Sequence, residues 1–140
     1  MAAQKSPVTL KVDGFTDREV ASVTYHFDQA VNKENQPAGI PRGGKIVVRV
    51  KALNNGNEEL LRWMTSETLS KNGSIQFMDS SDSKKEVKSV KFEGAYCIDF
   101  IEHWEDKQAN EETTLAHWEE ITISCRKIVN GQVEYENEWK

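Results

Sequence analysis

A doubled tripeptide is the part of this sequence whose residue types and spacing best suit chemistry. His103-Trp104-Glu105 recurs as His117-Trp118-Glu119 after an acidic stretch. If that stretch forms a hairpin, two imidazoles and two carboxylates meet across neighbouring strands, and such a set could hold zinc or a similar ion. Cross-strand His–Glu pairs are also ordinary stabilising contacts of a sheet, and no local ligand spacing such as HExxH is present. We favour the sheet contacts and predict no metal site.

The other candidates for catalysis have less support from their surroundings. Ser124 and Cys125 lack the flanking glycines of a nucleophile elbow, and Cys97 has no base nearby in the sequence. The segment PRGGK, Pro41 to Lys45, lacks the strand before it and the helix after it that a phosphate-binding loop needs. We therefore predict that the protein is not an enzyme and has no cofactor.

The overall composition predicts a single acidic domain, residues 1–140. The net charge of −5 and a pI near 5.3 argue against a nucleic-acid partner, because phosphate binding needs clustered Lys and Arg. Lys84, Lys85, Lys88 and Lys91 are diluted by acidic residues and are expected to form a solvated strand edge. No stretch approaches the ~20 apolar residues of a membrane span, so we expect no membrane insertion.

The N-terminus and the cysteines indicate a protein that starts in the cytosol. The segment MAAQKSPVTLKVDG has neither the apolar region nor the cleavage site of a Sec signal peptide. Cys97 and Cys125 lie within apolar strand patterns and are expected to be reduced, buried thiols rather than a disulfide. The sequence leaves open whether the two thiols lie close together.

The elements that must position these residues are mostly strands with alternating apolar residues. A short strand is expected at Thr9 to Asp13, and a glycine at position 94 is expected to mark a bulge or bend. Asn130-Gly131 predicts a type I′ hairpin turn, and the last strand is expected to end at Trp139. The expected buried faces are Ala21, Val23, Tyr25 and Phe27; Ile46, Val48 and Val50; Val90, Phe92, Tyr96, Ile98 and Phe100; and Ile121, Ile123 and Cys125.

One helix is expected, over Asn57 to Leu69. Asn57 can cap it, and Glu58 and Glu59 suit the positive end of the helix dipole. Lys71-Asn72-Gly73 is expected to end it with a glycine cap. Its apolar stripe comprises Leu60, Leu61, Met64 and Leu69, with Trp63 at the margin. With seven to nine strands, these elements predict a mainly β fold, either a sandwich or a barrel, with a single helix.

A long connection, Gln29 to Gly44 (QAVNKENQPAGIPRGG), joins two of the predicted strands. It has no apolar periodicity, and a structureless connection of this length is generally functional or disordered. Two interpretations remain open, a docking excursion or a mobile surface loop.

Four segments stand in a distinctive order along the chain. They are YHFDQ…GIPRGGKIVVRV (Tyr25 to Val50), AYCIDFIEHW (Ala95 to Trp104), ITISCRKI (Ile121 to Ile128) and EYENEW (Glu134 to Trp139). Their order resembles the hemolysin-coregulated protein family (TssD), the tube protein of type VI secretion, in the divergent branch found in Bacteroidetes. The resemblance covers nearly the whole chain, except for the helix and the acidic stretch DKQANEETTLAHWEE.

The resemblance implies a small β-barrel of two packed antiparallel sheets with one helix against it. It also implies six subunits in a ring with a strand-lined pore, and rings stacked into a tube. It implies assembly in the cytoplasm inside a contractile sheath, then ejection through the type VI apparatus without a Sec signal. The implied partners are sheath, baseplate and spike proteins, with effectors in the lumen. The long loop could then bridge subunits or rings, through Gln29, Pro37, Gly39, Pro41, Arg42, Gly43 and Gly44.

Three other functions remain open. A phage-type tail tube protein shares the geometry but serves a virion. A monomeric ligand-binding β-barrel would enclose a pocket, to which the four tryptophans could contribute. A metalloenzyme would use His103 and His117.

Overall fold

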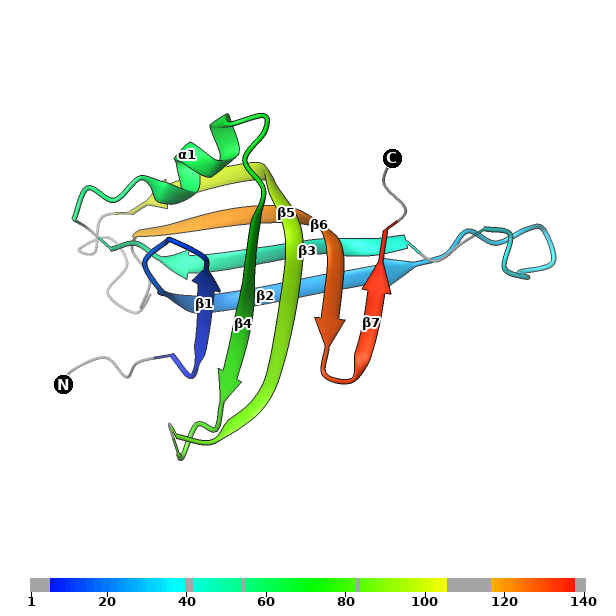
Figure 1. Ribbon diagram of the computed structural model, residues 1–140, viewed down its shortest axis with the longest axis horizontal. Helices are drawn as coiled ribbons and strands as arrows, with labels where there is room; N and C mark the ends of the chain where they lie inside the picture. Colours follow the sequence, from blue (N-terminus) through cyan, green and yellow to red (C-terminus); the bar gives the residue numbers. More distant parts are fainter. Residues whose placement is uncertain (1–5, 40–41, 54, 83, 106–116, 138–140) are drawn as a thin grey trace.

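Seven antiparallel strands and one helix make up the part of the chain that the computed structural model describes, residues 6–39, 42–53, 55–82, 84–105 and 117–137 (Figure 1). The helix is α1 (Glu59–Thr65). The strands are β1 (Val8–Val12), β2 (Arg18–Asp28), β3 (Arg42–Lys51), β4 (Lys71–Met78), β5 (Glu86–Trp104), β6 (His117–Asn130) and β7 (Val133–Glu136). None of the described helices is long and apolar enough to span a membrane.

The strands form a closed barrel with one extra strand. Their order is β3-β2-β1-β4-β5-β6-β7, and β3 also pairs with β6, so the first six close on themselves and β7 lies outside. The long strand β5 pairs with β4 up to Ala95 and with β6 as far as Trp104. The two sheets expected from the sequence form one continuous sheet, because the long strands β5 and β6 take part in both (Figure 1). The predicted mainly β barrel with one helix is confirmed.

The barrel interior is filled by aliphatic side chains from its central strands. Ile46, Val48 and Val50 of β3 face Ile121 and other buried residues of β6, as the alternation predicts. Each fully buried side chain of this size contributes roughly 1.5–3 kcal/mol relative to exposure. The same pattern holds for Ile123 and Cys125.

The buried face of β5 changes at Gly94, as a glycine bend allows. Gly94 has φ +59°, and the register between β4 and β5 shifts there. Beyond it, Ala95 and Cys97 are buried, whereas Tyr96 is half-buried and Ile98 is 43% exposed. The expected alternation through Tyr96 and Ile98 is therefore wrong, because the bend shifts the inward positions by one residue.

A register shift also corrects the expected face of β2. Val20 is buried and Ala21 is exposed, because the pairing with β3 is irregular between Val20 and Ser22. Val23 and Tyr25 are half-buried as expected, and Phe27 remains 39% exposed.

The helix is shorter than predicted and rotated. It ends at Thr65, and Lys71-Asn72-Gly73 begins β4 instead of capping it. Trp63 is fully buried and Leu61 is 40% exposed, so Trp63 belongs to the core and Leu61 does not. The N-cap residue is Glu58 rather than the predicted Asn57, and it makes no side-chain cap hydrogen bond; Asn57 Oδ1 accepts the Glu59 N–H at 2.9 Å.

The β6–β7 hairpin is where expected but its turn type differs. Asn130 pairs with Val133, so Gly131 and Gln132 form the loop. Gly131 has φ +63° while Gln132 is not in the left-handed region, which fits a type II′ turn rather than type I′. The last strand ends at Glu136 and Asn137 is already outside it, so the predicted end at Trp139 is wrong. The acidic loop after Glu105 lies outside the described residues.

The two cysteines are free and buried, as predicted. Cys97 pairs with Ile123, and Cys125 pairs with Ala95, so the thiols lie diagonally on adjacent strands. Diagonal neighbours are farther apart than a disulfide spans. Burial raises the pKa of Cys97 to about 11 and that of Cys125 to about 12.

The expected solvated lysine edge holds only in part. Lys84, Lys85 and Lys91 are exposed. Lys88 of β5 instead donates a hydrogen bond to the Tyr25 hydroxyl of β2, and this bond lowers the pKa of Tyr25.

Candidate assembly interface

The two histidines of the doubled tripeptide do not meet. Trp104 pairs with His117, and His103 pairs with Trp118, so the imidazoles belong to opposite faces of the sheet. His117 Nε2 lies 2.8 Å from Glu102 Oε2, whereas His103 Nε2 lies 3.8 Å from Oε1 of Glu105, two residues later in its own tripeptide. The described residues contain no group of three or more potential metal ligands. The joint His–Glu set that a metal site required is therefore not formed.

On the outer face of the sheet, the aromatic ring of Trp118 lies among side chains from three strands. The Arg49 guanidinium on β3 lies 3.8 Å from the Trp118 ring centroid, and the His103 ring on β5 stacks on it at 5.0 Å. Arg49 also pairs with Glu120 at 3.4 Å. These contacts join β3, β6 and β5 across the sheet.

Glu119, the last residue of the second tripeptide, faces the interior and forms a buried ion pair. The Arg18 guanidinium at the start of β2 lies 2.7 Å from Glu119 Oε1, and the side chains are only 2% and 8% exposed. Arg18 also donates to the Lys51 carbonyl at 2.9 Å. The two partners are 101 positions apart, and no local pattern in the sequence pointed to Arg18.

The long connection forms an ordered arm, defined here as residues 29–39, that projects from one end of the barrel (Figure 1). Val31 forms a β-bridge with Pro37, and Ala38 N–H donates to the Ala30 carbonyl at 2.8 Å. At the tip, Asn32 Oδ1 accepts two backbone N–H groups, at 2.9 and 3.0 Å. Asn35 takes a left-handed conformation, φ 64°. The expectation of a structureless loop is wrong. Short-range hydrogen bonds order the arm, although it has no extended strand pairing.

The predicted interface residues are divided between the arm and β3. Gln29 Nε2 donates to the Gly39 carbonyl at 2.6 Å, which closes the arm near its base. Arg42, Gly43 and Gly44 belong to β3 rather than to the loop, because pairing with β2 begins at Asp28↔Arg42. Pro41 lies outside the described residues.

Residues near the C-terminus support the base of the arm, which sequence reasoning did not identify. The Phe27 ring meets Tyr135 edge-on at 5.3 Å. Asn137 Nδ2 donates to the carbonyls of Gly43 (3.1 Å) and Cys125 (2.8 Å). A Cβ at Gly43 would overlap the Phe27 ring. The arm therefore leaves the barrel from a packed base.

One half of the barrel leaves two strand edges unpaired within the described chain. From Val20 onward, β2 pairs with β3 alone, and from Cys97 onward, β5 pairs with β6 alone. These edges border the same four-stranded region, β2-β3-β6-β5. Ile98, Ile101 and Trp104 along β5 are exposed. Unpaired edges of this kind are templates for pairing with another chain.

A closed barrel with a projecting arm and two unpaired strand edges has the features of a subunit in a larger protein assembly. A family model described as hemolysin coregulated protein Hcp (TssD) matches residues 5–140. The chain belongs to this family. Its members are tube proteins secreted by type VI systems, so this protein is a structural tube subunit and not an enzyme. The sequence-based resemblance is thereby confirmed.

Solved structures agree with this assignment. Hcp1 from Flavobacterium johnsoniae is 32% identical, with a TM-score of 0.80 over 93% of this chain and 98% of that one. Another Hcp crystal structure is 14% identical, with a TM-score of 0.75 over 96% and 100% of the two chains. The sheath–tube complex of an extracellular contractile injection system shares the fold, at 15% identity and a TM-score of 0.57 over 94% and 93%. Curated protein sequences give no match.

Proposed function

We propose that six copies of this chain close into a ring and that rings stack into the inner tube of a type VI secretion system. The observation that carries the ring is the pair of unpaired edges, β2 beyond Val20 and β5 beyond Cys97. They are two different edges of one four-stranded region, as a head-to-tail contact between identical subunits requires. Pairing β2 of one copy with β5 of the next extends the sheet around the ring.

The arm supplies the contact between rings in this proposal. Its hydrogen bonds and packed base reduce the ordering cost of docking. Gln29, Pro37 and Gly39 hold its shape, and Arg42, Gly43 and Gly44 follow in β3. The proposal also assigns Pro41, which lies outside the described residues, to this contact.

Partners and location follow from family membership. A similar fold occurs in a sheath–tube complex, which supports a surrounding sheath here. The proposal also includes baseplate and spike proteins at the tube ends, and effectors in the lumen. The tube assembles in the cytoplasm and leaves through the type VI apparatus.

The ring is tested by light scattering and electron microscopy of the purified protein without metal or ligand. We expect closed six-membered rings. A stable monomer at tens of micromolar contradicts the proposal and favours a ligand-binding barrel.

The arm is tested by deleting Asn32 to Ala38. Shortening a surface excursion changes loop-closure entropy only slightly, so the variant should fold and form rings while stacking and secretion fail. Folding is checked by thermal unfolding and stacking by electron microscopy. Normal secretion of the deletion variant would exclude the arm as the inter-ring contact.

A tail tube of another contractile system is the second candidate, favoured by the shared fold with the extracellular injection system. Neighbouring genes separate the two. A tape measure and capsid indicate a phage, whereas a sheath-disassembling ATPase indicates type VI secretion.

A further inference from the structure

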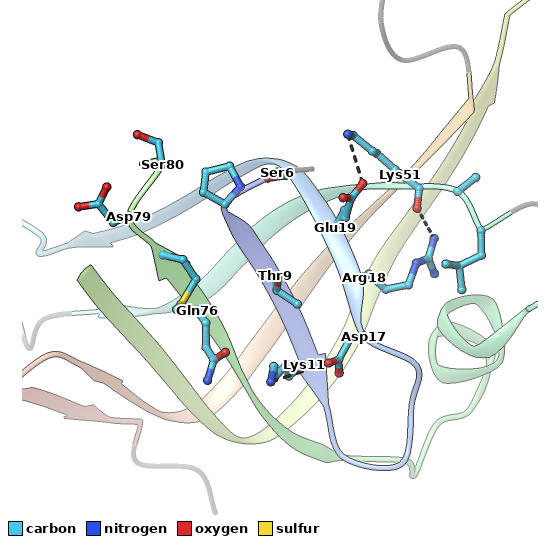
Figure 2. A pocket seen from close by; sticks show the side chains of 14 residues that line it. Ser6, Thr9, Lys11, Asp17, Arg18, Glu19, Lys51, Gln76, Asp79 and Ser80 are labelled. Carbon is cyan, nitrogen blue, oxygen red and sulfur yellow. Dashed lines mark hydrogen bonds and ion pairs between the residues drawn. The ribbon is translucent and has the colours of Figure 1, made fainter. Parts of the chain in front are cut away.

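A groove of about 550 Å³, lined by both charged and apolar side chains, runs along the outer face of β1 (Figure 2). It exists because β1 is only five residues long. It pairs with β2 at just two positions, Thr9↔Glu19 and Leu10↔Arg18. The last residues of β4 and the chain following β3 form the remaining walls. Nothing in the proposed ring contact uses this surface.

Two ion pairs flank the groove. Lys11 Nζ lies 3.8 Å from Asp17 Oδ2, and Lys51 Nζ lies 3.2 Å from Glu19 Oε2. Thr9 lies between the two pairs (Figure 2). All four charged side chains are between 28% and 58% exposed, and exposed pairs of this kind contribute about 0–1 kcal/mol each. They can therefore exchange partners with an incoming charge at little cost.

The groove and the arm lie at opposite ends of the same strand. Arg18 and Glu19, at the start of β2, line the groove, and Asp28, at its end, leads into the arm. Eleven residues of strand correspond to about 33 Å. A copy placed end-to-end beyond the arm therefore presents its groove toward the arm tip, without any two-fold relation between the copies.

The arm tip carries charges that complement those of the groove. Lys33 and Glu34 are adjacent, exposed and opposite in sign. Asn32 Oδ1 holds the Glu34 N–H at 2.9 Å, so the backbone that carries both charges is already shaped. The arm thus offers one cation and one anion, and the groove offers a carboxylate beside a lysine on each side.

We propose that the groove along β1 receives the arm of a second copy of this chain in the adjacent ring. Lys33 meets the carboxylate of Asp17 or Glu19, and Glu34 meets the ammonium of Lys11 or Lys51. This inference rests on the proposed tube function and names the receptor for the arm.

Thiol cross-linking of the full chain tests the docking. In the variant Glu34→Cys with Thr9→Cys, a short bismaleimide should link arm to groove. Links between rings join subunits into columns, so the denatured products should form a ladder that continues past six subunits. The native thiols do not interfere near pH 7, because their pKa values of about 11 and 12 keep them protonated and both are buried. The matched control Glu34→Cys with Lys91→Cys places the second thiol on an exposed site outside the groove and should give no ladder.

The outcomes separate the two proposals. A ladder that stops at six subunits means that the arm docks within a ring, and it overturns the inter-ring receptor. Stacked rings without cross-links, or an equal ladder from the control, also overturn the groove while leaving the tube function intact. Failure of the parent protein to form rings overturns the tube function itself.

Charge reversal gives an independent readout. Lys11→Glu with Lys51→Glu should raise the ring concentration needed for stacking by roughly tenfold, because several arms act together at each junction. Glu34→Lys in the same chain should restore part of the loss. An unchanged stacking concentration, or no recovery, contradicts the charge contact.

Discussion

The two ends of the barrel differ in how far their residues are buried. Helix α1 lies at the end where β2 begins (Figure 1). There the Arg18–Glu119 pair is nearly inaccessible to solvent, and Trp63 of α1 is fully buried. At the other end, every residue of the arm is exposed; Asn32 Oδ1 accepts the Gln36 N–H, and Gln29 donates to the Gly39 carbonyl, and these bonds hold its shape.

This difference assigns a separate role to each end. Buried groups set the free energy of unfolding, because removing them leaves cavities or unpaired charges. Exposed, locally bonded segments open at little cost to the whole fold. We therefore expect changes at the α1 end to affect folding and changes at the arm end to affect assembly.

The largest expected effect is at the α1 end, from Arg18→Met. It leaves the Glu119 carboxylate buried without its partner, and breaking a buried pair in this way costs about 3–5 kcal/mol. Urea unfolding measures the loss. The matched control is Arg49→Met, whose partner Glu120 is more accessible and whose cost should stay near 1 kcal/mol or below.

A double variant tests the reason for that loss. Arg18→Met with Glu119→Leu removes both charges and should recover much of the stability, because an apolar pair of similar volume can replace a buried ion pair. Equal losses in Arg18→Met and Arg49→Met would contradict the role of burial in setting the stability of the α1 end.

The sequence predicted the elements of the barrel better than their registers. The alternation of Ile121, Ile123 and Cys125 identified a buried face correctly because β6 stays regular there. The faces of β2 and β5 were partly wrong, since the irregularity after Val20 and the bend at Gly94 depend on pairing with other strands. A period-two pattern cannot show where such a shift occurs.

The sequence predicted only those parts of the interface that depend on residues close to one another in the chain. The length of the connection and its prolines and glycines identified the arm. Its base depends on Phe27 meeting Tyr135, and the α1 end depends on Arg18 meeting Glu119. Both contacts join residues about a hundred positions apart, so only the folded barrel reveals them.

An intermediate effect is expected from Gly43→Ala at the base of the arm. The new methyl group would overlap the Phe27 ring and push it from Tyr135. Aromatic pairs of this kind contribute about 0.5–1.5 kcal/mol, so folding should weaken slightly while ring stacking weakens more. Thermal unfolding and electron microscopy measure the two. Gly39→Ala, whose Cβ would lie 3.7 Å from Ala30, is the control for folding and should leave thermal unfolding unchanged.

The smallest expected effect is from His103→Gln with His117→Gln, which lie toward the same end as the Arg18–Glu119 pair. Glutamine keeps polarity and removes the imidazoles, so the variant loses the His117–Glu102 contact and the stack of His103 on Trp118. Exposed cross-strand contacts contribute about 0.2–1 kcal/mol each. The melting temperature should therefore fall only slightly, and a chelator should leave that of the parent unchanged.

A structural zinc site would behave otherwise, because its loss removes folding free energy outright. A large chelator-induced drop in the parent, absent from the double variant, would show that a metal joins these strands. A small shift instead shows that burial, rather than position at this end, decides which residues the fold depends on.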